Sequence, residues 1–156
     1  MLYEIHLYVP KTGQLTPSMI EWLYQHGRST DQPEQFWPVR KLNQRAMARV
    51  LVNLDPTLYA QPGDGDDIEL IYPNQQIDLR LYVHQRGVIL SFPYMGSLLA
   101  RIVLGISYTY IRFLYEAAGF WSYDPQLNVL SYADDYQSID ETAALMDTVL
   151  PKLLNS

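Results

Sequence analysis

Residues 68–92 read IELIYPNQQIDLRLYVHQRGVILSF, a succession of three apolar runs separated by two short turn sequences. The runs cover residues 68–72, 77–83 and 88–92. In the middle run apolar and polar residues alternate with the period of two that marks a half-buried strand. The apolar side carries Ile77, Leu79, Leu81 and Val83, and the polar side carries Asp78, Arg80, Tyr82 and His84. Because connections this short join antiparallel neighbours, the stretch predicts a three-stranded meander with one solvated face.

Further strands are predicted on both sides of this meander. Residues 1–9 place Tyr3, Ile5 and Leu7 on one side and Glu4, His6 and Tyr8 on the other. Two short runs at 120–123 and 128–132 flank the turn sequence Asp-Pro-Gln and predict a late hairpin. Residues 55–67, which are rich in proline, glycine and aspartate, predict an exposed loop.

Four helices are predicted, at residues 17–26, 38–54 and 97–118 and from the capping box Ser138–Glu141 onward to a kink or end at Pro151. The first helix has a buried stripe of Ile20, Leu23 and Tyr24. The second has an apolar face of Val39, Leu42, Ala46, Val50 and Leu54. The third is the most apolar of the chain, and the apolar residues at helical spacing are Leu99, Ile102, Val103, Ile106, Tyr110, Phe113, Leu114 and Ala117.

The order of these elements predicts an α+β fold. A mainly antiparallel sheet, made of the N-terminal strand, the meander and the late hairpin, carries about four helices that chiefly cover one face. With 156 residues the chain suits one globular domain, 1–156, whose core needs neither a metal nor a crosslink.

Composition restricts the compartment and the chemistry. The chain has no cysteine, which excludes disulfides, thiolate metal sites and thiol nucleophiles. No secretion signal is apparent at the start of the sequence. The apolar segment Leu98–Ala118 is interrupted by Arg101 and Arg112, which favours a buried core helix over a membrane span. We therefore expect a cytoplasmic protein.

The formal net charge of −6 makes nucleic acid an unlikely partner and favours a basic one. The charge is uneven, because residues 1–60 hold six basic and five acidic residues and the remainder holds five basic and twelve acidic ones. Lys41, Arg45 and Arg49 follow one another at four-residue steps, and on the predicted helix they form a basic stripe. This stripe is a candidate anion site, although a solvated helix edge explains it equally well.

Candidate catalytic groups are few. His6 and His84 lie on the polar sides of predicted strands, and Asp124, Asp134 and Asp135 form an acid and base pair only if the fold joins them. Asp124 precedes a proline and is explained more simply as a turn residue. We find no motif for a phosphate, dinucleotide, metal or other cofactor, and we expect none.

Aromatic and acidic residues gather around the late hairpin, at Trp121, Tyr123, Tyr132, Asp134, Asp135 and Tyr136. Tyrosine and tryptophan favour interfaces, although such residues also close core edges. The leading hypothesis is therefore a small acidic module that binds a protein partner, as an inhibitor, immunity protein or adaptor does. A small hydrolase or isomerase with a carboxylate and histidine site is the alternative, and a homo-oligomer is a third possibility.

Overall fold

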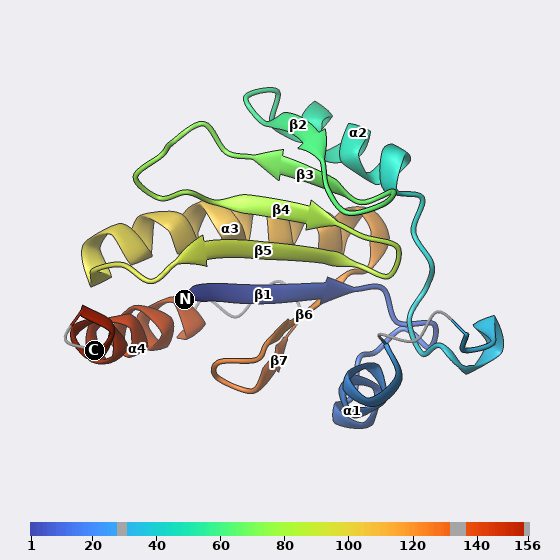
Figure 1. Ribbon diagram of the computed structural model, residues 1–156. Coiled ribbons are helices and arrows are strands. Elements are labelled where there is room, and N and C mark those ends of the chain that lie inside the picture. The colour runs from blue at the N-terminus through green and yellow to red at the C-terminus, as the bar shows by residue number, and fades with distance from the viewer. Residues whose placement is uncertain (28–30, 132–136, 155–156) are drawn as a thin grey trace.

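The computed structural model describes residues 1–27, 31–131 and 137–154, and within α4 the side chains of residues 139–153. The fold is α+β, a seven-stranded antiparallel sheet with four α-helices (Figure 1). The strands are β1 (Leu2–Tyr8), β2 (Tyr59–Pro62), β3 (Ile68–Ile71), β4 (Arg80–Val83), β5 (Val88–Pro93), β6 (Trp121–Asp124) and β7 (Val129–Ser131). The helices are α1 (Pro17–His26), α2 (Gln44–Leu54), α3 (Ser97–Ala118) and α4 (Gln137–Leu154), with a short 3₁₀ helix η1 (Glu34–Phe36).

The strand order β2-β3-β4-β5-β1-β6-β7 places the N-terminal strand inside the sheet. Leu7 of β1 is opposite Val88 of β5 on one side and opposite Ser122 of β6 on the other. The predicted N-terminal strand, meander and late hairpin are all confirmed. The predicted loop at 55–67 is wrong in part, because β2 forms within it and pairs with β3.

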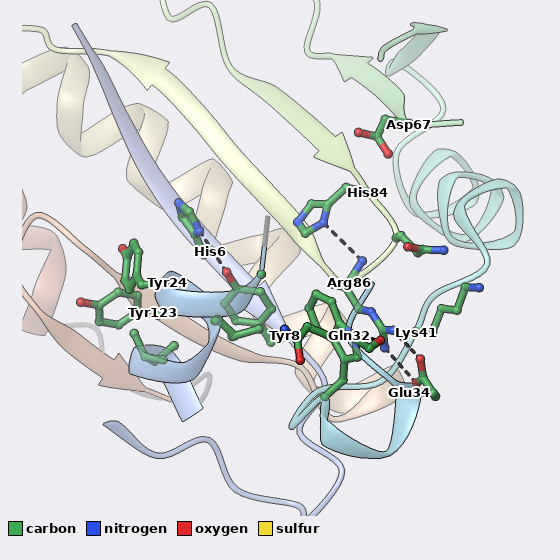
Figure 2. Close-up of a pocket in the computed structure, with 15 residues that line it drawn as sticks. His6, Tyr8, Tyr24, Gln32, Glu34, Lys41, Asp67, His84, Arg86 and Tyr123 are labelled. Atoms are coloured by element: carbon green, nitrogen blue, oxygen red, sulfur yellow. Dashed lines mark hydrogen bonds and ion pairs between the residues drawn. The ribbon is translucent and has the colours of Figure 1, made fainter. Parts of the chain in front are cut away.

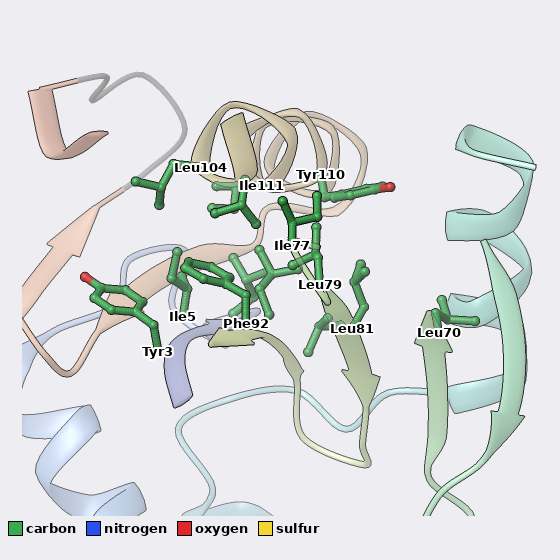
Figure 3. Packing of buried hydrophobic residues seen from close by; sticks show 14 of the residues in the cluster. Tyr3, Ile5, Leu70, Ile77, Leu79, Leu81, Phe92, Leu104, Tyr110 and Ile111 are labelled. Atoms are coloured by element: carbon green, nitrogen blue, oxygen red, sulfur yellow. The ribbon is translucent and has the colours of Figure 1, made fainter. Parts of the chain in front are cut away.

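The inner face of the sheet makes the main core. Leu70, Leu81, Leu90 and Ile5 are consecutive cross-strand partners from β3 to β1, and all four are buried. Buried side chains of α2, α3 and α4 pack against this face, and Figure 3 shows the layer between sheet and helix. Removing such apolar area from water stabilises the fold by about 25 cal/mol per Å².

Helix α3 lies across the inner face, but its orientation differs from the prediction. Val103, Tyr110 and Leu114 are buried as predicted. Leu99 and Ile102 are exposed instead, and Ala100 and Leu104 take buried positions. The helix is apolar around most of its circumference, so periodicity alone does not select the buried side. By length and composition α3 is also able to cross a membrane, a test that the core helices of soluble proteins pass as well.

Helix α2 is shorter than predicted. Residues 38–42 are extended, because Val39 forms a β-bridge with Pro10 and the Arg40 N–H donates to the Val9 carbonyl at 2.8 Å. The helix then begins after Asn43, whose side chain accepts from the Ala46 N–H. Its buried residues are Ala48 and Leu51, whereas Ala46 and Val50 of the predicted face are exposed.

Helix α1 lies apart from the other helices, near the C-terminal end of β1 (Figure 1). Thr16 caps it and Ile20 is buried, as the sequence predicts, but Tyr24 is 61% exposed and lies outside the core. Together with Trp37 and Val39, Ile20 forms a second cluster that packs against Tyr123 of β6. Tyr123 is opposite His6, and both point to the outer face of the sheet, the side opposite the main core. Since the second cluster lies on Tyr123, α1 and residues 31–40 cover one end of this outer face.

At the C-terminal end, α4 continues through Pro151 to Leu154 and packs against α3. Of the predicted kink or end at Pro151, the end does not occur, because proline near the end of a helix removes only one of the last hydrogen bonds. The Ser138 side chain of the predicted capping box lies outside the described part of the chain.

Candidate functional site

A pocket of about 720 Å³ lies between α1 and the outer face of the sheet. Its floor comes from His6 and Tyr8 of β1 and Tyr123 of β6, and the β4–β5 turn contributes His84 and Arg86. Figure 2 shows these side chains converging from separate segments of the chain. The volume falls in the range of small-ligand pockets, which is roughly 300–1,000 Å³.

The side chains of Glu4, His6 and Tyr8 lie on the same side of β1 and form a hydrogen-bonded row. The His6 Nε2 lies 2.9 Å from the Glu4 carboxylate, and its Nδ1 lies 3.2 Å from the Tyr8 hydroxyl. With Nε2–H donating to the carboxylate, Nδ1 is free to accept from Tyr8. This row is a carboxylate–histidine–hydroxyl chain that opens into the pocket.

His84 is held in the β4–β5 turn. Its N–H donates to the Gly87 carbonyl at 3.0 Å, and its Nδ1 accepts from the Arg86 N–H at 3.3 Å. Burial, with a smaller contribution from His6, lowers the pKa of His84 to about 4. The ring is therefore neutral near pH 7 and carries its proton on Nε2. That buried Nε2 has no hydrogen-bond acceptor among the described residues.

Arg86 closes the side of the pocket next to residues 34–39. Its guanidinium group binds both oxygens of Glu34, lies 4.0 Å from the centre of the Trp37 ring, and donates to the Val39 carbonyl. Hydrogen bonds from Arg86, together with Lys11, lower the pKa of Glu34 to about 2. The Arg86 Nε, also buried, meets no acceptor in the described ranges.

Tyrosines form the other side of the pocket. The rings of Tyr24 and Tyr123 meet edge to face at 6.3 Å, and the Tyr123 hydroxyl donates to Asn128. Burial and neighbouring groups raise the pKa values of Tyr8 and Tyr24 above the ordinary tyrosine value. Both hydroxyls therefore stay protonated at neutral pH and act as hydrogen-bond donors.

The structure brings His6 and His84 to one pocket but leaves Asp124 elsewhere. Asp124 lies at the end of β6, where it accepts from the Tyr3 hydroxyl and from the N–H groups of Gln126 and Leu127. These bonds satisfy the carboxylate within its turn. The candidates Asp134 and Asp135 lie outside the described residues, as do Tyr132 and Tyr136 of the predicted aromatic surface.

The predicted basic stripe does not form on one helix. Lys41 precedes α2 in the extended segment, where it lines the pocket, while Arg45 and Arg49 lie exposed on α2. Trp121 and Tyr123 both pack in the second cluster against α1, and only 8% of Tyr123 is exposed. No ion pair joins Lys41 to a carboxylate within the described chain.

The candidate residues chosen from the sequence did not include Glu4, Tyr8, Glu34 or Trp37. The alternation in residues 1–9 already placed Glu4 and Tyr8 beside His6, so that row was accessible from the pattern. Glu34 and Trp37 carry no such signal, because they meet Arg86 only through the tertiary fold. Among the described residues, no group of three histidine or acidic side chains is arranged to hold a metal ion.

Beyond the pocket, the outer face of β2, β3 and β4 remains without a covering helix in Figure 1. Four side chains project from it: Tyr59, Glu69, Arg80 and Tyr82. Tyr59 and Arg80 are both opposite Ile71, and Glu69 is opposite Tyr82. These positions alternate with Leu70 and Leu81, which face the main core. Arg80 donates to Glu69 at 2.6 Å and to Asp78 at 3.2 Å. Although burial opposes ionisation, hydrogen bonds from Gln61 and Arg80 lower the pKa of Glu69. This face is polar, aromatic and internally bonded.

Comparison of the chain with protein-family models, curated protein sequences and solved structures gives no match, so function must be argued from the geometry of these surfaces.

Proposed function

We propose that this protein is a binding module that holds a basic protein partner on the outer face of its sheet. The observation that carries the proposal is the polar, tyrosine-rich outer face of β2, β3 and β4, which α2, α3 and α4 leave open because they pack on the other side. The open part of the outer face is formed by Tyr59, Gln61, Glu69, Arg80 and Tyr82.

Tyrosine supports recognition at such a face for a physical reason. It offers a large apolar ring with few rotatable bonds, and its hydroxyl forms hydrogen bonds at the rim of an interface. Tyr59 is 54% exposed on the edge strand, and Tyr82 is half-buried beside Glu69. Covering these rings removes apolar area from water at a small entropic cost.

The charge near this face favours a cationic partner. Arg80 is already held by two carboxylates, and the turn between β2 and β3 adds Asp64, Asp66 and Asp67. Burial and the neighbouring carboxylates raise the pKa of Asp67, which means that its negative charge is poorly compensated. A partner lysine or arginine supplies the missing countercharge.

The contact surface in this proposal differs from the one that the sequence suggested. Trp121 and Tyr123 support α1, and the remaining residues of the predicted aromatic surface are not described. The acidic and aromatic character of the module is retained, but its centre moves from the late hairpin to the outer face.

The proposal is tested by affinity purification from the native host with matched variants. Tyr59→Arg places a cation on the outer face, and Thr109→Arg places the same side chain on the exposed side of α3. We expect native mass spectrometry to find one stoichiometric basic partner with the wild type and with Thr109→Arg. We expect Tyr59→Arg to weaken that complex by roughly tenfold or more, as loss of a central interface tyrosine does.

Equal recovery of the partner with both variants contradicts the assignment to the outer face. Recovery of no stoichiometric protein with any variant contradicts the binding module itself.

A second candidate, a small hydrolase or isomerase, is favoured by one observation. The row of Glu4, His6 and Tyr8 has the carboxylate–base–hydroxyl order of an acid–base site and faces the same pocket as His84. Hydrolysis of p-nitrophenyl esters by the purified protein tests it. If this candidate is right, the wild type and His26→Gln hydrolyse the ester faster than buffer alone, and His6→Gln does not. Equal rates for the two variants contradict it.

A further inference from the structure

The β4–β5 turn brings two unpaired hydrogen-bond donors to the pocket between α1 and the sheet. His84 Nε2 and Arg86 Nε are both buried N–H groups, and neither has an acceptor in the part of the chain that the structure describes. A buried donor without a partner destabilises the fold, and native proteins satisfy such groups with water or a ligand. Two of them in the lining of one pocket indicate a position for an acceptor group.

Several acceptors in the pocket are already occupied. Arg86 and Lys11 take both oxygens of Glu34, and the Nδ1 of His84 accepts from the backbone of its own turn. His6 is bonded on both ring nitrogens. The complement of the two unpaired N–H groups is therefore a group that accepts hydrogen bonds.

The form of His84 agrees with a donor and argues against a metal ligand. Its Nδ1 accepts a hydrogen bond, so its proton resides on Nε2, and no lone pair faces the pocket. Its lowered pKa keeps it neutral and available as a donor at pH 7.

Charge and shape restrict the occupant further. Lys41 lines the pocket with its ammonium group unpaired by any described carboxylate, whereas Asp67 lines it as an acid that no described cation pairs. Ile20, Leu23 and the Trp37 ring provide apolar wall. Because the unpaired donors outnumber the one unpaired acid, an anionic head with an apolar body fits best.

We infer that this pocket binds a small organic oxyanion, with its charged oxygens on His84 Nε2, Arg86 Nε and Lys41 and its apolar part against α1 and Trp37. The pocket contains none of the five residues proposed to hold a protein partner, so this inference does not depend on the existence of that partner. A carboxylate or a phosphate supplies the same acceptor chemistry, so the experiment distinguishes the two.

The test is an NMR titration of the full-length protein with benzoate, inorganic phosphate and the neutral isostere benzamide. In proteins that keep His84, the ring is followed through its Nε2–H resonance, which reports a hydrogen bond directly. In the His84 variants, the affinity is taken from the backbone amide resonances of Arg86 and Gly87. We expect benzoate to shift this resonance saturably and to bind more tightly than benzamide. A saturable shift with phosphate as well assigns the site to oxyanions in general, and a shift with benzoate alone assigns it to organic carboxylates.

Variants separate binding from folding. His84→Phe removes the donor and should weaken benzoate by roughly tenfold, the equivalent of one buried hydrogen bond to a charged group. His84→Gln retains an N–H at a similar reach and should restore most of the affinity. Asp67→Asn should tighten binding and Lys41→Gln should weaken it. His26→Phe is the matched control, since His26 packs on Trp22 outside the pocket.

Two results overturn the inference. One is the absence of a saturable shift with either anion. The other is benzamide binding as tightly as benzoate. Backbone amide spectra of each variant establish that it is folded, so a loss with His84→Phe that His84→Gln restores is a loss of the donor.

Discussion

Gly87 is the residue on which the pocket's geometry depends most directly. It lies in the β4–β5 turn, and a Cβ atom there would collide with the Leu7 carbonyl and lie 3.0 Å from the Tyr8 ring. Glycine is required here because β1 backbone approaches the turn closely, which brings His84 beside the row of Glu4, His6 and Tyr8.

We expect Gly87→Ala to lower the free energy of unfolding by about 1–3 kcal/mol, the usual cost of overpacking. Gly105→Ala is the matched control, since no atom lies within 4 Å of the added Cβ in the middle of α3. It should raise stability by about 0.5–1 kcal/mol through helix propensity. Urea unfolding of both variants checks this, and the explanation fails if both substitutions change stability in the same direction.

At the level of elements, the strands followed from the sequence more completely than the helices did. A strand buried on one side leaves its period of two in the sequence, and β1 and the meander were predicted on that basis. Residues 38–42 instead had helical spacing, but the bridge between Val39 and Pro10 outweighs local propensity. A pairing between residues so far apart leaves no local pattern.

The candidate site was predictable to a similar, partial extent. The alternation placed His6 and His84 on the polar sides of their strands. That they share a pocket depends on β5, which lies between β1 and β4 and pairs with both. The part played by Arg86, Glu34 and Trp37 was inaccessible, because their contacts join segments that no sequence spacing relates.

For the whole molecule, the buried neutral His84 links stability to pH. Above pH 6.5 the group is neutral in both the folded and the unfolded chain and contributes nothing. Between pH 6.5 and about 4 the unfolded chain takes up a proton that the folded chain refuses, so stability falls as pH falls. The full loss, reached below the folded pKa, is roughly 3 kcal/mol.

Urea unfolding of the wild type and of His84→Gln between pH 7 and pH 4.5 measures this effect. The range stops at pH 4.5 because Glu34, whose pKa is lowered from 4.5 to about 2 in the folded chain, contributes its own pH dependence below that value. We expect the wild type to lose stability faster than the variant as pH falls. Parallel curves would show that another group is responsible.

The position of β1 also has a consequence for how the chain is made. This strand precedes both of its neighbours in the chain by a long interval, since β5 and β6 come from residues 88–93 and 121–124. On the ribosome β1 therefore remains unpaired on both edges until β5 has emerged, and its second edge is closed only after β6. Pairings this distant along the chain place a protein toward the slow end of folding rates, on the order of milliseconds to seconds. During that interval two bare strand edges are open to other chains, which makes the nascent protein a natural client for chaperones.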